Sequence, residues 1–315
     1  MTCSRAVGLV AGVAADALFG DPKRQHPVAW FGTWASAVEK RSYADSVWAG
    51  AMHLVVTLAP VLAGGLVAES LGRRSPVWRA ISTAAVTWVA LGARSLASEA
   101  TQLADRLDTG DVGGARGQLP NLCGRDASQL DVPELARATC ESVAENTNDA
   151  VVCTFFWGAI GGVPGIVLHR AVNTLDAMIG HRNERYERFG KVSAMADDAL
   201  AWLPARITGG LAVLLSPLVG GRIEDSAMIL ARDRNRHPSP NGGWCEAAWA
   251  GALGVQLGGR NLYYGNRFED RPLLGEGSRP DAAAVRKSAR LSALVTAAAT
   301  SLAAIGVCCR NRRRQ

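Results

Sequence analysis

Long apolar blocks alternate with charged segments along this chain. Residues 47–68 and 291–309 contain no Asp, Glu, Lys or Arg. A helix of about 20 apolar residues spans the hydrocarbon core of a bilayer, so each block is long enough to cross a membrane. Four further blocks are shorter, or are interrupted by charged residues, glycine or proline: 6–19, 77–97, 150–172 and 207–220. This pattern predicts an all-α, polytopic integral membrane protein with polar interfacial loops or helices.

The number of membrane crossings stays open between four and six. We expect a single membrane-embedded domain over residues 1–315, because no low-complexity linker divides the chain. The alternative is a soluble all-α protein, which would have to bury two uninterrupted runs of membrane length in one core. Arginines at 310, 312, 313 and 314 directly follow the last block. The positive-inside rule then predicts a multi-pass protein of the cell membrane with a cytoplasmic C-terminus.

Composition excludes several other classes of protein. Apolar residues make up 48% of the chain and charged residues 20%, so an intrinsically disordered chain is excluded. The net charge is +6, but the arginines are dispersed among carboxylates and form no basic stripe interleaved with aromatics. We therefore expect no nucleic-acid partner. The seven cysteines are scattered and contain no C-x-x-C pair, which argues against a disulfide scaffold.

A stripe of carboxylates precedes the fourth apolar block. Glu141, Glu145 and Asp149 are spaced i, i+4, i+8, which places them on one face of a helix. Because like charges at this spacing repel, we expect a divalent metal, arginines or a cationic substrate opposite them. Oxygen ligands without His or Cys suit Mg²⁺ better than Zn²⁺. The alternative is a solvated helix face with Arg137 paired to Glu141.

The segment 170–198 interleaves carboxylates with a dense set of cations. Arginine grips phosphate with two hydrogen bonds, and lysine adds a mobile charge, so the mixture favours a metal-bridged polyphosphate site. The alternative is an amphipathic helix with i, i+4 ion pairs such as Glu184–Arg188. A histidine here is a candidate general base for an amine. The candidate residues are Asn173, Asp176, His181, Arg182, Asn183, Glu184, Arg185 and Lys191.

A third polar segment, 232–265, contains the constrained turn HPSPNGG. Asn241 lies in this turn, and Glu246 follows at an expected helix start. Ordinary loop chemistry accounts for each of these residues taken singly. The chain contains no Walker A lysine motif and no G-x-G-x-x-G after a strand. Any nucleotide would therefore be bound without a P-loop.

Taken in order, these segments resemble one enzyme family. The sequences ESVAENTNDA, GGVPG, RAVNTLDAMIGHRNERYERFG, DDALAWLPARIT, HPSPNGGWCEAAWAGALGV and NLYYG are similar to motifs of the adenosylcobinamide-phosphate synthases. The resemblance extends over essentially the whole chain.

This resemblance implies a membrane-bound ligase of cobalamin biosynthesis. Such enzymes join a propionate carboxyl of adenosylcobyric acid to the amine of (R)-1-amino-2-propanol or its O-phosphate. The amide ligation is expected to consume ATP with Mg²⁺ through an acyl phosphate. The product then enters assembly of the nucleotide loop, so the later enzymes of that assembly are possible partners.

Combining the residues with this chemistry assigns roles. The expected metal ligands are Glu141, Glu145, Asp149 and Asp176. The expected catalytic residues are His181, Glu184 and Glu145, with His181 or Glu184 accepting the amine proton. The expected substrate- and phosphate-binding residues are Asn173, Arg182, Asn183, Arg185, Lys191, Asn241 and Glu246.

Two other functions stay open at this point. One is a non-catalytic membrane sensor related to β-lactamase induction, against which the RNERY and SPNGGWCEAA segments argue. The other is a transporter, for which polar residues at the membrane midplane and broken helices are typical. Charged clusters in loops and at the ends of spans favour an interfacial enzyme instead.

Overall fold

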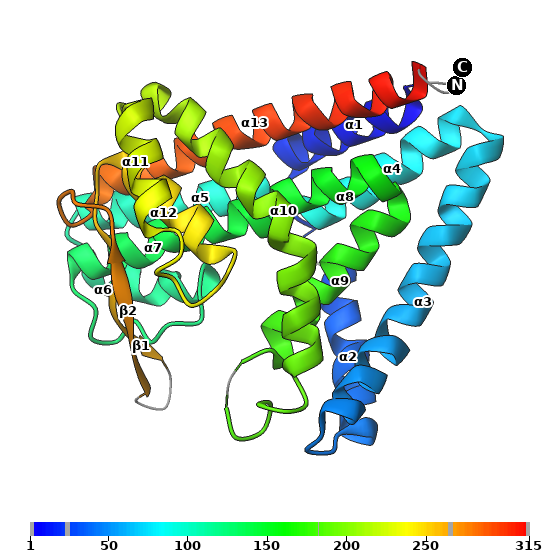
Figure 1. Cartoon of the computed structure of the whole chain (residues 1–315), viewed down its shortest axis with the longest axis horizontal. Helices are drawn as coiled ribbons and strands as arrows, with labels where there is room; N and C mark the ends of the chain where they lie inside the picture. Colours follow the sequence, from blue (N-terminus) through cyan, green and yellow to red (C-terminus); the bar gives the residue numbers. More distant parts are fainter. Residues whose placement is uncertain (1–2, 23–25, 182, 264–266, 313–315) are drawn as a thin grey trace. The chain divides into compact units, whose positions relative to one another are not determined.

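A computed structural model describes residues 3–22, 26–181, 183–263 and 267–312. The described chain is mainly helical, with one two-stranded sheet, which confirms the all-α prediction apart from this hairpin (Figure 1). It forms two compact units, and each unit is built from separate stretches of the sequence. Unit 1 comprises the described parts of Met1–Gly92, Asp149–Ala201 and Ala299–Gln315. Unit 2 comprises Ala93–Asn148 and the described parts of Trp202–Ala298, and the single catalytic domain stays a prediction.

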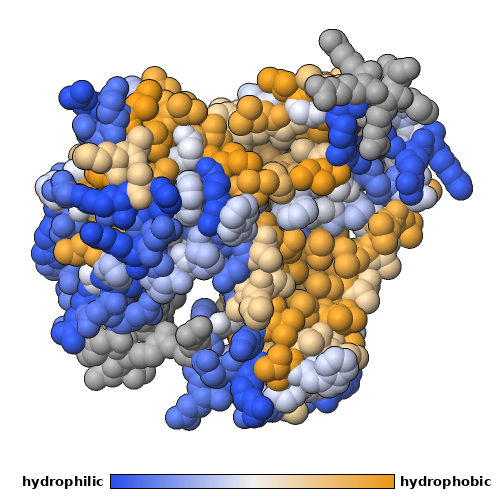
Figure 2. Space-filling model, in the orientation of Figure 1, coloured by the Kyte–Doolittle hydropathy of each residue, from blue (hydrophilic) through white to orange (hydrophobic). Residues whose placement is uncertain are grey.

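Among the described residues, four helical segments are long and apolar enough to cross a membrane. They are Val47–Arg74, Pro76–Asp108, Lys191–Val219 and Ala282–Arg310. Each contains one of the apolar blocks of the sequence or nearly all of it. Figure 2 shows the apolar surface over the first of these helices, where Trp48, Val55 and Leu66 are exposed. Exposed apolar side chains along a whole helix are expected where lipid is the surrounding solvent.

Unit 1 is a group of packed helices. Its members are α1 (Ser4–Phe19), α2 (Pro27–Ser42), α3 (Val47–Arg74), α4 (Pro76–Leu91), α8 (Cys153–Gly161), α9 (Val163–Ile179), the first part of α10 (Lys191–Leu215) and the end of α13 (Ala282–Arg312). Phe31, Leu58 and Leu175 form a core between α2, α3 and α9. The glycines of α1 let α4 approach closely, since a β-carbon on Gly8 would lie 2.6 Å from Thr83 Cβ.

The predicted block 150–172 is divided in the structure. Gly162 separates α8 from α9 with a φ of 68°, a conformation that favours glycine. Glu69 of α3 accepts a hydrogen bond from the Val163 N–H at 3.2 Å and pairs with Arg5. This acceptor satisfies one of the free N–H groups at the start of α9.

The two ends of the described chain meet in unit 1. The Cys3 and Cys308 Sγ atoms lie 2.7 Å apart, which places the start of α1 beside the end of α13 (Figure 1).

Unit 2 combines helices with the hairpin. Its members are α5 (Ala93–Asp108), α6 (Val112–Gln118), the short 3₁₀ helix η1 (Leu119–Asn121), α7 (Val132–Asn146), the end of α10, η3 (Ser216–Val219), α11 (Ile223–Asp233), α12 (Gly242–Leu253), β1 (Leu257–Tyr263), β2 (Arg267–Leu274) and most of α13. The strands are antiparallel, with Gly259 opposite Arg271. Helix α12 is buried over most of its length, and Trp249 Nε1 donates a hydrogen bond to Ser288.

A π-helical segment, η2 (Thr147–Val152), follows α7 directly. Its turns are wider than α-helical turns, so the i, i+4 spacing no longer aligns side chains across it. Asp149 lies inside this segment, whereas Glu141 and Glu145 lie on α7.

Candidate functional site

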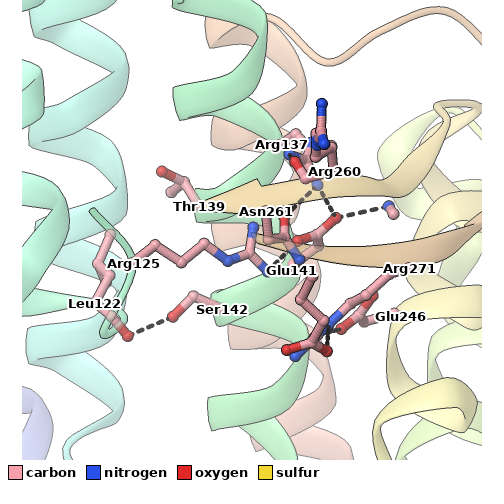
Figure 3. A network of polar contacts seen from close by, with 12 residues as sticks. Leu122, Arg125, Arg137, Thr139, Glu141, Ser142, Glu246, Arg260, Asn261 and Arg271 are labelled. Carbon is pink, nitrogen blue, oxygen red and sulfur yellow. Dashed lines mark hydrogen bonds and ion pairs between the residues drawn. The ribbon is translucent and has the colours of Figure 1, made fainter. Parts of the chain in front are cut away.

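Glu141 lies at the centre of a buried ion network in unit 2 (Figure 3). It pairs with Arg125, and its Oε1 lies 3.3 Å from Arg137 Nη1. The Gly258 N–H donates to the same oxygen at 2.7 Å. Arg137 also donates to Asn261 Oδ1 at 2.8 Å. Two arginines therefore supply the positive charge expected opposite Glu141, and the network joins α7 to the hairpin.

A second group in unit 2 brings three potential ligands together. Glu145, His237 and Glu246 each offer one atom within 4.8 Å of the others. His237 Nε2 lies 3.3 Å from Glu246 Oε1, and Glu246 is fully buried. Arg271 Nη1 lies 3.1 Å from His237 Nε2 and 3.5 Å from Glu246 Oε1. The three atoms are close enough to hold a cation, and the Arg271 guanidinium beside them offsets part of the negative charge of the two carboxylates.

The pKa shifts of this pair follow from its contacts. Burial disfavours a charged imidazole, but the hydrogen bond and negative charge of Glu246 raise the pKa of His237 above its usual value. Burial alone would raise the pKa of the Glu246 carboxyl, but the hydrogen bond from His237 lowers it instead. These contacts therefore favour a charged imidazole and a charged carboxylate.

Glycine in the HPSPNGG turn allows this approach. A β-carbon at Gly242 would lie 2.7 Å from His237 Cε1 and 3.0 Å from Glu145 Oε1. Sequence reasoning selected Glu145 and Glu246 but missed His237. His237 could have been found from its position, because it begins the same turn and lies four residues before Asn241.

Unit 1 contains a cluster of aspartates. Burial and the charges of Asp149 and Asp198 raise the pKa of Asp176 to about 6. The carboxylate of Asp197 is repelled by those of Asp149 and Asp176. The structure thus brings together Asp149 and Asp176, two of the four predicted metal ligands. It adds Asp197 and Asp198 of the DDALAW segment, which sequence reasoning did not select.

Two polar side chains connect this cluster to α9. Asn173 Nδ2 donates to Asp197 Oδ1 at 3.3 Å, and Arg170 Nη1 donates to Asn173 Oδ1 at 3.3 Å. Arg170 interacts electrostatically with Asp149, Asp197 and Asp21. Arg170 therefore lies within electrostatic reach of at least three carboxylates. Carboxylate oxygens are the ligands that a hard divalent cation such as Mg²⁺ prefers.

The structure describes most, but not all, of the residues predicted to bind phosphate in the segment after α9. Arg182 lies outside the described residues. Arg185 is engaged with α2, since its Nη2 lies 2.9 Å from Glu39 Oε1 and its guanidinium lies 4.0 Å from the Tyr43 ring centroid. These contacts favour anchoring of the segment after α9. The remaining predicted residues of this segment are exposed: His181, Asn183, Glu184 and Lys191.

Comparison with known proteins gives a consistent result over most of the chain. The family model of the CobD/Cbib protein matches residues 9–292. A cobalamin biosynthesis protein CobD of Mycobacterium tuberculosis is 47% identical over 300 residues, covering 95% of both chains. The protein of the same name from Geobacter metallireducens is 41% identical over 297 residues, covering 92% of this chain and 93% of the other. No solved structure matches the chain.

Proposed function

Since the chain belongs to the CobD/Cbib protein family, we propose that it catalyses the amide ligation that converts adenosylcobyric acid to adenosylcobinamide or its phosphate. The amine is (R)-1-amino-2-propanol or its O-phosphate. The observation that carries the proposal is the group of mutually repelling carboxylates around Asp176 in unit 1.

The reaction requires activation of a carboxylate. A carboxylate resists attack by an amine until it loses its negative charge and gains a leaving group. Transfer of a phosphoryl group from ATP gives an acyl phosphate and ADP, and the amine then displaces phosphate to form the amide. Mg²⁺ would supply charge neutralisation of the phosphates during this transfer.

The aspartates of unit 1 would hold this ion. Asp149 and Asp176 are the proposed ligands, together with Asp197 and Asp198. Their mutual repulsion is relieved when a divalent cation is bound, which couples binding of the ion to stability of the cluster.

The amine must lose a proton before it attacks. His181 and Glu184 lie in the exposed segment after α9, where water and a soluble amine have access. We assign proton acceptance to one of these two side chains. Lys191, exposed at the start of α10, supplies a positive charge for a phosphate.

The direct test is an assay with defined components. Purified protein in detergent receives adenosylcobyric acid, aminopropanol phosphate and Mg-ATP, and the product is identified by mass. Amide formation supports the proposal, and its absence with every nucleotide tried refutes it.

The metal assignment is tested separately with variants. Asp149→Asn and Asp176→Asn should lose most activity and raise the Mg²⁺ concentration required. Asp225→Asn is the matched control, because Asp225 is exposed and forms only a 3.8 Å pair with Arg222. Unchanged Mg²⁺ dependence in both site variants would refute these ligands and leave the reaction itself standing.

A further inference from the structure

Two arginines of unit 2 stack on one tryptophan. The Arg206 and Arg234 guanidinium carbons each lie 5.0 Å from the centroid of the Trp244 ring. Arg206 also lies 4.4 Å from the ring centroid of Trp202. Stacking on indole orients a planar guanidinium and leaves its edge available for hydrogen bonds.

These two guanidiniums have no acidic partner among the described residues. Arg206 donates to Asn241 Oδ1 and to the Trp202 carbonyl, both at 2.8 Å. Within the described chain, the Arg234 guanidinium has the Trp244 ring as its contact. By contrast, Arg232 and Arg236 on the same stretch of chain both pair with Asp233. Two neighbouring cations without a carboxylate repel each other, and an anion bound between them would remove this repulsion.

The start of α12 adds to the positive potential. This helix of 12 residues begins at Gly242, two residues before Trp244. The dipole of this helix favours an anion near this end. Ser239 Oγ accepts hydrogen bonds from the Asn241 and Gly242 N–H groups at 3.2 and 3.1 Å, which fixes the turn before the helix. The turn also fixes Asn241, whose side-chain oxygen accepts from Arg206.

We propose that Arg206 and Arg234, stacked on Trp244, bind the phosphoryl group of a small soluble phosphomonoester. Two guanidiniums match the charge of a phosphate dianion, and each can donate two parallel hydrogen bonds to it. Asn241 positions Arg206 through its side-chain oxygen. The phosphate chemistry follows from these contacts alone. Only the identification of the ligand as aminopropanol phosphate rests on the proposed function.

Binding of (R)-1-amino-2-propanol O-phosphate to the detergent-purified protein, measured by calorimetry without ATP or adenosylcobyric acid, tests the proposal. Arg206→Gln and Arg234→Gln should each weaken binding by about 10-fold or more, the loss expected for one charge-assisted hydrogen bond. Arg236→Gln removes a neighbouring charge and should leave affinity unchanged. Arg234→Lys should bind more tightly than Arg234→Gln. Thermal unfolding of every variant checks that the fold is kept.

Three outcomes would overturn the proposal. The first is equal affinity of the unmodified protein and both glutamine variants for the phosphorylated amine. The second is equal affinity for the phosphorylated and the free amine. The third is binding of ATP, but not the phosphomonoester, in a manner that depends on both arginines. Repeating the titration in phosphatidylcholine and phosphatidylglycerol nanodiscs tests a lipid source, since competition by the anionic lipid would assign the arginines to a headgroup instead.

This measurement separates the two proposals. Arginine-dependent phosphate binding without amide formation would refute the ligase and keep the phosphate site. Amide formation by the unmodified protein, together with unaltered phosphate binding by both glutamine variants, would keep the ligase and refute the phosphate site.

Discussion

The Asp176 carboxylate is folded against Gly180, so closely that a β-carbon at Gly180 would overlap Asp176 Oδ1. Gly180 ends α9, and its N–H donates to the Asp176 carbonyl at 2.7 Å. Its φ of −75° is open to any residue, so glycine is needed here for space rather than for backbone conformation. The absence of a side chain at Gly180 therefore leaves space for the Asp176 carboxylate.

Gly180→Ala should therefore impair the site without unfolding the protein. The added methyl displaces the Asp176 carboxylate, and we expect activity to fall by about 10-fold or more at limiting Mg²⁺, a free-energy loss of about 1.4 kcal/mol. Gly64→Ala is the control, because a β-carbon there meets nothing within 4 Å. It should keep full activity and gain about 0.5–1 kcal/mol of stability, as glycine is unfavourable inside a helix. Equal activity of the two variants over a range of Mg²⁺ would contradict this role of Gly180.

Asp176→Asn should change stability in opposite directions with and without metal. In a chelator, removing one of several mutually repelling carboxylates should raise the unfolding midpoint. With Mg²⁺ present, the unmodified protein should be stabilised by binding, whereas the variant should gain less. Differential scanning fluorimetry in EDTA and in Mg²⁺ measures both effects. A variant that gains as much from Mg²⁺ as the unmodified protein would exclude Asp176 as a ligand.

The His237–Glu246 pair should give stability a defined pH dependence. The pKa of His237 is raised, so its contribution is complete below the unfolded value of 6.5 and is lost as pH rises through the folded pKa. The pKa of Glu246 is lowered, so its contribution is present above 4.5 and is lost as pH falls through the folded pKa. Both residues therefore contribute fully to the free energy of unfolding between pH 4.5 and pH 6.5.

Unfolding midpoints across pH 4 to 9 measure this dependence. His237→Gln should lower the midpoint near pH 6 and remove the His237 contribution to the decline toward alkaline pH. Destabilisation by the same amount at every pH would contradict the ion pair.

Glu141→Gln should damage folding more than catalysis. The substitution leaves Arg125 and Arg137 without their buried counter-charge, and breaking a buried pair in this way costs about 3–5 kcal/mol. Glu187→Gln, at an exposed position, is the control. Limited proteolysis and thermal unfolding should report loosening of the hairpin in the first variant only. A stable Glu141→Gln protein with an altered Mg²⁺ requirement would return Glu141 to the metal site.

The apolar pattern predicted the helical membrane architecture, because an uncharged run of about 20 residues by itself indicates a membrane-spanning helix. The paired strands Leu257–Tyr263 and Arg267–Leu274 carried no such signal in the sequence. Element type is least certain for short segments, where burial by the rest of the protein decides the outcome.

The candidate site was less predictable because it depends on contacts between distant residues. The i, i+4, i+8 spacing of Glu141, Glu145 and Asp149 assumed regular α-helix, and the π-helical segment at Thr147–Val152 alters that spacing. Asp149 instead interacts with Asp176 and Asp197, residues that no local spacing connects to it. His237 likewise gains its partner Glu246 only through the turn that precedes α12.

The contact between Cys3 and Cys308 also bears on topology. Because the start of α1 lies beside the end of α13, we expect both to face the same aqueous compartment. That arrangement predicts an even number of complete crossings, which the four candidate spans of the described residues would give if each crosses the bilayer once. Reporters fused to the two ends should accordingly give the same compartment, and the arginines after the last span predict that this is the cytoplasm.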